Sequence, residues 1–139
     1  IGVYDIIVEH FDRLLTKLQL EKDIARKMKL LKYAKFQLRY FHMFTIAGSD
    51  GYYRNEFAST IGYVLSCENL SCVEQLKDDW LKVAKMWRQF GRELGVLLSD
   101  EKEILSALEF LINSIKKITN FEVNMIEKLE ECLLEVTQS

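Results

Sequence analysis

Apolar residues recur along most of the chain at spacings of three and four, which place side chains on one face of an α-helix. The first such segment runs from about Gly2 to Leu18, with the stripe Val3, Ile6, Ile7, Phe11, Leu14, Leu15 and Leu18. The second begins near Asp23, a residue type suited to an N-cap, and its stripe is Ile24, Met28, Leu31, Leu38 and Phe41. A glycine-containing turn, "AGSDG", ends this second segment.

Three more helices are expected after this turn. The third covers roughly Tyr52 to Ser66. The fourth begins at "SCVE", Ser71 to Glu74, which has the spacing of a capping box. Its apolar stripe is Val73, Leu76, Trp80, Val83, Trp87, Phe90, Leu94 and Leu97. The fifth helix follows a boundary at Ser99 or Asp100 and runs to about Val136.

The pattern as a whole is typical of a helical domain. The chain has no proline, the residue that most often interrupts long helices, and no segment shows the alternation of a strand. The sequence therefore predicts an all-α fold, a five-helix bundle whose long fourth and fifth helices are antiparallel. We expect a single helical domain over residues 1–139, and Ile rather than Met at the first position favours a fragment of a longer chain.

Composition narrows the possible partners. The net charge of −2, from 19 basic and 21 acidic residues, provides no general attraction for nucleic acid or for an anionic membrane. No apolar run approaches the roughly 18 residues that a membrane span requires. The three cysteines, Cys67, Cys72 and Cys132, form no framework spacing, which favours reduced thiols and a cytoplasmic location.

Two charged residues occupy positions where apolar side chains are expected. Glu122 lies in the stripe of the fifth helix, and Arg54 shares a face with Ala58, Ile61 and Leu65 on the third. A buried charge is costly unless it is paired, and an arginine fork matches a carboxylate. We therefore expect Arg54 and Glu122 to meet. The alternative is that both side chains are solvated, Arg54 in an exposed first turn and Glu122 where the fifth helix leaves the core.

Other candidate chemistry is weaker. His10 and His42 lie on different helices, and together with the cysteines they form no metal-binding spacing. The sequence thus predicts no metal, no cofactor and no self-sufficient catalytic group. Trp80, Trp87 and Phe90 could form an aromatic ligand pocket, although aromatic residues at helical spacing more often belong to a core. Basic residues lie along the second helix. Among them, Lys27, Lys32, Lys35 and Arg39 are candidates for contact with an acidic partner.

Three segments together resemble the helical C-terminal region of proteins similar to butirosin biosynthesis protein H: "DGYYRNEFASTIGYVLS", "LKDDWLKVAKMWRQFGREL" and "IKKITNFEVNMIEKLEE". The segment "GVYDIIVEHFDRLL" is similar to the helix that opens that region. The matching positions are Gly51, Arg54, Phe57, Ala58, Trp87, Glu122 and Leu129. The chain departs from the family pattern at Thr60 and Ile61, where Phe-Leu is usual.

The resemblance implies a companion domain of an acyltransferase that moves an acyl group from a carrier protein to an amine in antibiotic assembly. The nucleophile of such an enzyme is expected in an upstream peptidase-like region. By resemblance, Arg54, Trp87 and Glu122 are expected to contribute to substrate binding. The basic residues of the second helix would dock an acyl carrier or peptidyl carrier protein.

Two further hypotheses belong to other classes. The domain would be a stand-alone interaction module, or a homodimer, if an exposed apolar strip formed from Tyr4, Tyr33, Phe36, Tyr40 and Phe44. A ligand-sensing bundle would rest on the two tryptophans alone. The basic surface of the second helix bears on the accessory-domain hypothesis. The apolar strip bears on the interaction-module hypothesis, and the two tryptophans bear on the ligand-sensing hypothesis.

Overall fold

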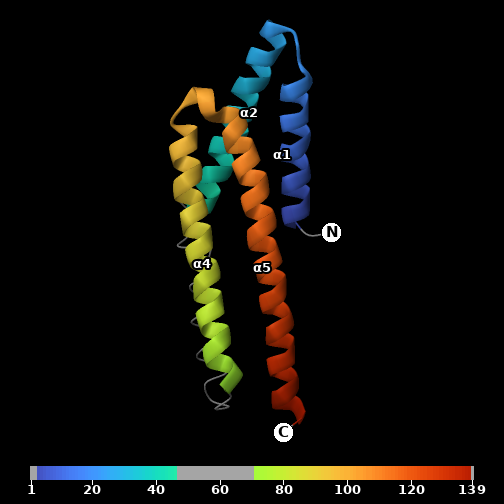
Figure 1. Cartoon of the computed structure of the whole chain (residues 1–139), viewed down its shortest axis with the longest axis vertical. Coiled ribbons are helices and arrows are strands. Elements are labelled where there is room, and N and C mark those ends of the chain that lie inside the picture. The colour runs from blue at the N-terminus through green and yellow to red at the C-terminus, as the bar shows by residue number, and fades with distance from the viewer. Residues whose placement is uncertain (1–2, 47–70, 139) are drawn as a thin grey trace.

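Four helices form two antiparallel hairpins in the computed structural model, which describes residues 3–46 and 71–138 (Figure 1). The first hairpin consists of α1 (Val3–Leu20) and α2 (Ile24–Ile46). The second and longer hairpin consists of α4 (Ser71–Leu98) and α5 (Ile104–Gln138). The most extensive packing is between α4 and α5, while α1 lies against α5 and α2 against α4. The all-α class predicted from the pattern is confirmed.

The predicted number of helices is wrong. The described residues form four α-helices rather than five. The remaining predicted helix, from Tyr52 to Ser66, lies outside the described residues. The sequence of that segment includes Gly62, a residue of low helix propensity.

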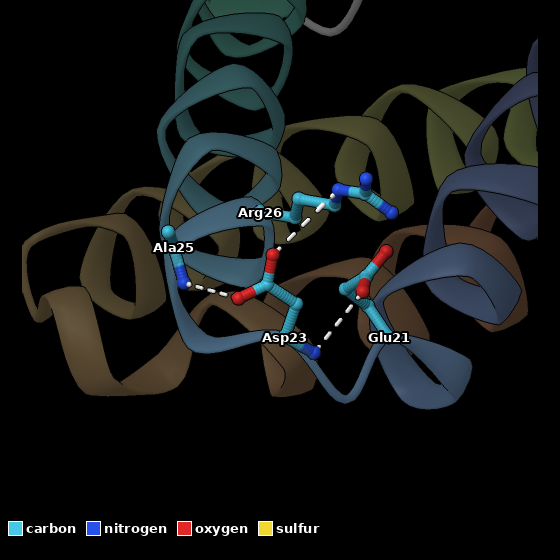
Figure 2. A network of polar contacts seen from close by, with 4 residues as sticks. All are labelled: Glu21, Asp23, Ala25 and Arg26. Carbon is cyan, nitrogen blue, oxygen red and sulfur yellow. Dashed lines mark hydrogen bonds and ion pairs between the residues drawn. The ribbon is translucent and has the colours of Figure 1, made fainter.

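Polar side chains hold the turn between α1 and α2 (Figure 2). The Asp23 carboxylate accepts a hydrogen bond of 3.3 Å from the backbone N–H of Ala25, as an N-cap does. The backbone N–H of Asp23 donates in turn to the Glu21 carboxylate at 3.1 Å, and the Arg26 guanidinium lies 3.6 Å from Asp23. The N-cap predicted at Asp23 is confirmed.

An aspartate also caps the turn between α4 and α5. A 3₁₀ turn, Glu101–Glu103, leads into α5, and the Asp100 carboxylate accepts a hydrogen bond of 3.0 Å from the N–H of Lys102. Of the two predicted caps, Asp100 is therefore the one that caps this 3₁₀ turn. The result is a tight reversal that sets α4 and α5 side by side along most of their length (Figure 1).

The core follows the seam between α4 and α5. Its fully buried side chains include Val83, Trp87, Leu94, Leu108, Leu111 and Ile115. The first hairpin adds residues such as Phe11, Leu18 and Leu38. The predicted stripe of α2 is only partly right, because Ile24 and Met28 are 78% and 57% exposed. These two side chains therefore lie on the outer side of the first turns of α2 and not in the core.

Two glycines on α4 let α2 approach closely. Gly91 is buried, and its carbonyl accepts a hydrogen bond of 2.9 Å from the His42 ring N–H. One turn later, a Cβ added at Gly95 would lie 2.8 Å from Nε2 of His42. The absence of a side chain at Gly95 therefore makes room for the imidazole, and His42 is a packing residue on this contact.

Cys132 is disulfide-bonded, which corrects the expectation of three reduced thiols. Its side chain is 1% exposed on the inner face of α5. The side chains of the two other cysteines, Cys67 and Cys72, lie outside the described residues. The spacing of three cysteines could not reveal the bond, because bonding depends on which thiols the fold brings together. Among residues 3–46 and 71–138, no helix combines the length and apolar character that crossing a bilayer requires.

Leu94→Ala should lower the free energy of unfolding by about 2–5 kcal/mol, because it leaves a cavity at a side chain with no exposed surface. Leu20→Ala is the matched control, since the same substitution removes a side chain that is 73% exposed. It should cost less than about 1 kcal/mol. Urea titrations followed by circular dichroism measure both values. Equal losses in the two variants would contradict the assigned core.

Thiol titration of the denatured, unreduced chain should find one free thiol out of three cysteines, since one disulfide uses the other two. Peptide mapping under the same conditions then assigns the partner of Cys132 to Cys67 or Cys72. Three reactive thiols before reduction would show that the bond does not form in solution.

Candidate functional site

Helix α2 presents a row of exposed aromatic and aliphatic side chains. Tyr33, Phe36, Tyr40 and Met43 follow one another at spacings of three and four, so they lie on one side of the helix. They are 48%, 65%, 52% and 52% exposed, respectively. The rings of Phe36 and Tyr40 are stacked, with centroids 6.3 Å apart and planes inclined by 19°. A continuous row of this kind is more than the scattered exposed apolar residues of an ordinary surface.

Basic side chains border this row. Lys29 lies one turn before Tyr33 on the same side, and Lys32 and Arg39 flank the row along one edge. All three are exposed. We refer to these seven residues as the α2 face: Lys29, Lys32, Tyr33, Phe36, Arg39, Tyr40 and Met43. No residue of α2 from Ile24 to Ile46 is acidic, whereas six are basic. The positive charge of the α2 face is therefore not neutralised within its own helix.

The predicted partner-binding residues divide into two pairs. Lys32 and Arg39 lie on the α2 face, as described above. Lys27 and Lys35 are only half-exposed. Lys35 lines, with Lys32, Met28, Leu31 and Ile104, a small pocket of about 180 Å³ between α2 and the start of α5. The spacing of charges could not separate the two pairs, because it does not show which side of α2 packs on α4.

The predicted apolar strip is confirmed in part. Tyr33, Phe36 and Tyr40 are exposed. Tyr4 instead packs onto Trp87, with ring centroids 5.5 Å apart, and the side chain of Phe44 lies outside the described residues. Met43, which the sequence prediction omitted, completes the row. Its spacing of three from Tyr40 is the sequence signal that could have identified it.

A second feature is a buried polar contact between α4 and α5. The indole N–H of Trp87 donates a hydrogen bond of 2.9 Å to the carboxylate of Glu122. Trp87 is 1% exposed and Glu122 is 6% exposed. The prediction that Glu122 points into the core is therefore right, and the alternative of a solvated Glu122 is wrong. Trp80 and Trp87 are both core residues, buried along the same stripe.

Aromatic rings pack against the indole of Trp87. Phe90 meets Trp87 edge to face, with centroids 5.9 Å apart, and continues through Phe41 to Phe11 on the first hairpin. The indole of Trp87 thus lies among aromatic rings, in a setting where polar contacts are strong and missing partners are costly. Both side chains lie within the core. Their predicted role in substrate binding is not tested by this contact and stays a prediction.

Arg54, the predicted partner of Glu122 and third residue of the predicted substrate site, lies outside the described residues. Its pairing with Glu122 therefore stays a prediction.

Sequence reasoning missed one other buried acid. Asp79 is 8% exposed on α4. It accepts a hydrogen bond of 3.1 Å from Gln75, and the Lys128 ammonium of α5 lies 3.5 Å away. Its spacing, three residues after Leu76 and four before Val83, was the available signal. Asp79 and Lys128 form a polar link between α4 and α5, since each helix contributes one partner.

The part of the chain that the structure describes contains no group of three or more His, Cys, Asp or Glu side chains placed to hold a metal ion. Comparison of the chain with protein-family models, curated proteins and solved structures found no match in any of the three. The resemblance to the butirosin biosynthesis family therefore stays a prediction, and the function must be argued from the residues themselves.

A double-mutant cycle on Trp87→Phe and Glu122→Leu should give a coupling free energy of about 1.5–3 kcal/mol, the range for a hydrogen bond to a charged group. Denaturant unfolding of the wild type, both single variants and the double variant measures it. Glu122→Gln should cost less than Glu122→Leu, because the amide oxygen still accepts from the indole. Additive effects would show that the contact contributes nothing to stability. The same cycle with Arg54→Met tests the predicted ion pair.

Proposed function

We propose that this domain is a helical protein-interaction module that binds an acidic, amphipathic helix of a partner on its α2 face. The observation that carries the proposal is the combination of exposed aromatic side chains with a helix that has six basic residues and no acidic one. Aromatic residues and arginine are enriched at the energetic centres of interfaces. Lysine and arginine at the edge would guide an acidic partner into place.

The physical fit is that of a helix lying along a helix. An amphipathic partner would place its apolar positions, spaced by three and four, against Tyr33, Phe36, Tyr40 and Met43. Its acidic positions would lie beside Lys32 and Arg39. Exposed ion pairs contribute little affinity individually. We therefore expect the aromatic row to supply most of the binding free energy. The charges would set the orientation of the partner helix and the rate of association.

A second candidate is the accessory domain of a carrier-dependent acyltransferase, as the resemblance implies. An acidic carrier protein would suit the same basic helix. Such an enzyme would work in the cytoplasm, where structural disulfides are rare. The disulfide of Cys132 therefore counts against this candidate, and we rank the interaction module first. The neighbouring sequence separates the two, because only the acyltransferase requires a catalytic region upstream.

Lys32→Glu combined with Arg39→Glu should weaken binding of an acidic helical probe at least about tenfold, because two attractive contacts become repulsive; tenfold corresponds to about 1.4 kcal/mol. The probe is a fluorescein-labelled 18-residue peptide with leucines on one face and glutamates beside them. Fluorescence anisotropy measures its affinity, which should fall as salt is added.

Two controls accompany this measurement. Lys77→Glu with Lys85→Glu makes the same change of charge at exposed positions of α4 and should leave the affinity within about twofold. Phe36→Ala should weaken binding without changing the salt dependence, since it removes apolar contact only. If the probe binds wild type and the Lys32/Arg39 variant equally, or if a peptide with lysines in place of glutamates binds as well, the proposed function is wrong.

A further inference from the structure

The C-terminal half of α5 presents a surface of opposite charge. From Val123 onward, Val123, Ile126 and Leu134 are 47%, 47% and 57% exposed. Glutamates lie among them and are also exposed. We refer to this surface as the α5 face: Val123, Ile126, Glu127, Glu130, Glu131 and Leu134. The spacings of three and four within it place these side chains along one side of the helix.

The position of this surface in the fold leaves it accessible. Helix α5 continues well past the N-terminal end of α1, so only α4 accompanies its C-terminal half among the described helices (Figure 1). The basic residue in this half of α5, Lys128, is directed toward Asp79 on α4. The Lys128 ammonium therefore faces α4, whereas the glutamates of the α5 face lie on the outer side of α5.

The stretches that carry the exposed apolar residues of the α2 face and the α5 face are similar in length. Tyr33 to Met43 spans about 15 Å, and Val123 to Leu134 spans about 16 Å, at 1.5 Å per helical residue. Each carries exposed apolar side chains together with charged ones, and the charges are positive on α2 and negative on α5. Figure 1 places α2 beside the upper part of the long hairpin and the C-terminal half of α5 at its lower end.

Like-with-like pairing between two molecules is disfavoured by the same charges. Two α2 faces would bring Lys29, Lys32 and Arg39 against their copies, and two α5 faces would bring glutamates against glutamates. Like charges facing each other at an interface are costly. Among contacts between identical chains, the unlike pairing of α2 with α5 is the one that both sets of charges favour.

We propose that a second copy of this chain is the partner of the α2 face, which binds the α5 face of that copy. The inference rests on the proposed function, since it names the acidic helix that α2 recognises. Such a contact uses two different surfaces, so each molecule keeps one of each available, and the assembly grows as a chain unless it closes into a ring. The faces are small compared with a standard interface of about 20–30 residues a side. We therefore expect weak, concentration-dependent association.

Sedimentation velocity of the whole chain from about 10 µM to 1 mM, a range suited to weak binding, should show a rising average mass. Lys32→Glu/Arg39→Glu should remain monomeric over this range, and so should Glu127→Lys/Glu130→Lys. An equimolar mixture of these two variants should associate again, because the α2 face of the second variant is native and meets the native α5 face of the first. Circular dichroism verifies that both variants are folded.

The control Asp78→Lys/Glu109→Lys makes the same charge change at exposed positions outside the α5 face and should associate as the wild type does. A wild type that stays monomeric to 1 mM would overturn the inference, as would a mixture of the two variants that stays monomeric. Binding of the acidic peptide to the α2 face distinguishes the two failures. If the peptide binds and the chain remains monomeric, the proposed function stands and the partner is a different protein.

Discussion

A buried carboxylate joins α5 to α4, and we infer that it helps to fix the register between the two helices. Glu122 accepts the indole N–H of Trp87 across the seam of the long hairpin. An apolar residue at this position would pack against Trp87 in several rotations of the helix, whereas a hydrogen bond of 2.9 Å accepts one. The contact therefore contributes more to the uniqueness of the packing than to net stability, because desolvation of the carboxylate offsets part of the attraction.

Fixing this seam determines which surfaces remain outside. With α4 and α5 paired, α1 covers one side of their upper half and α2 covers another, where Gly91 and Gly95 admit His42. Helix α2 then buries Ala34 and Leu38 and leaves Phe36 and Tyr40 outward. The C-terminal half of α5 extends past the end of α1 (Figure 1). The two surfaces proposed to interact are both consequences of this arrangement.

The polar contacts divide into those that shape the fold and those available to a partner. Asp23 and Asp100 cap turns, and Asp79 links α4 to α5 through Lys128. These acids are already engaged within the chain. The basic residues of the α2 face and the glutamates of the α5 face lie instead on the outside of their helices, where charge acts on another molecule.

Apolar spacing and capping residues along the chain were enough to predict the all-α class, the long α4 and α5, a cap at Asp23, a cap at Ser99 or Asp100, and the inward position of Glu122. Helical periodicity and capping are local properties. The sequence could not predict that the indole of Trp87 contacts Glu122, that Cys132 is disulfide-bonded, or that Tyr4 packs onto Trp87 while Phe36 lies outside. These features depend on which helix faces meet, and α2 shows why: its sequence offers two rows of apolar residues, and only packing against α4 decides which of them is buried.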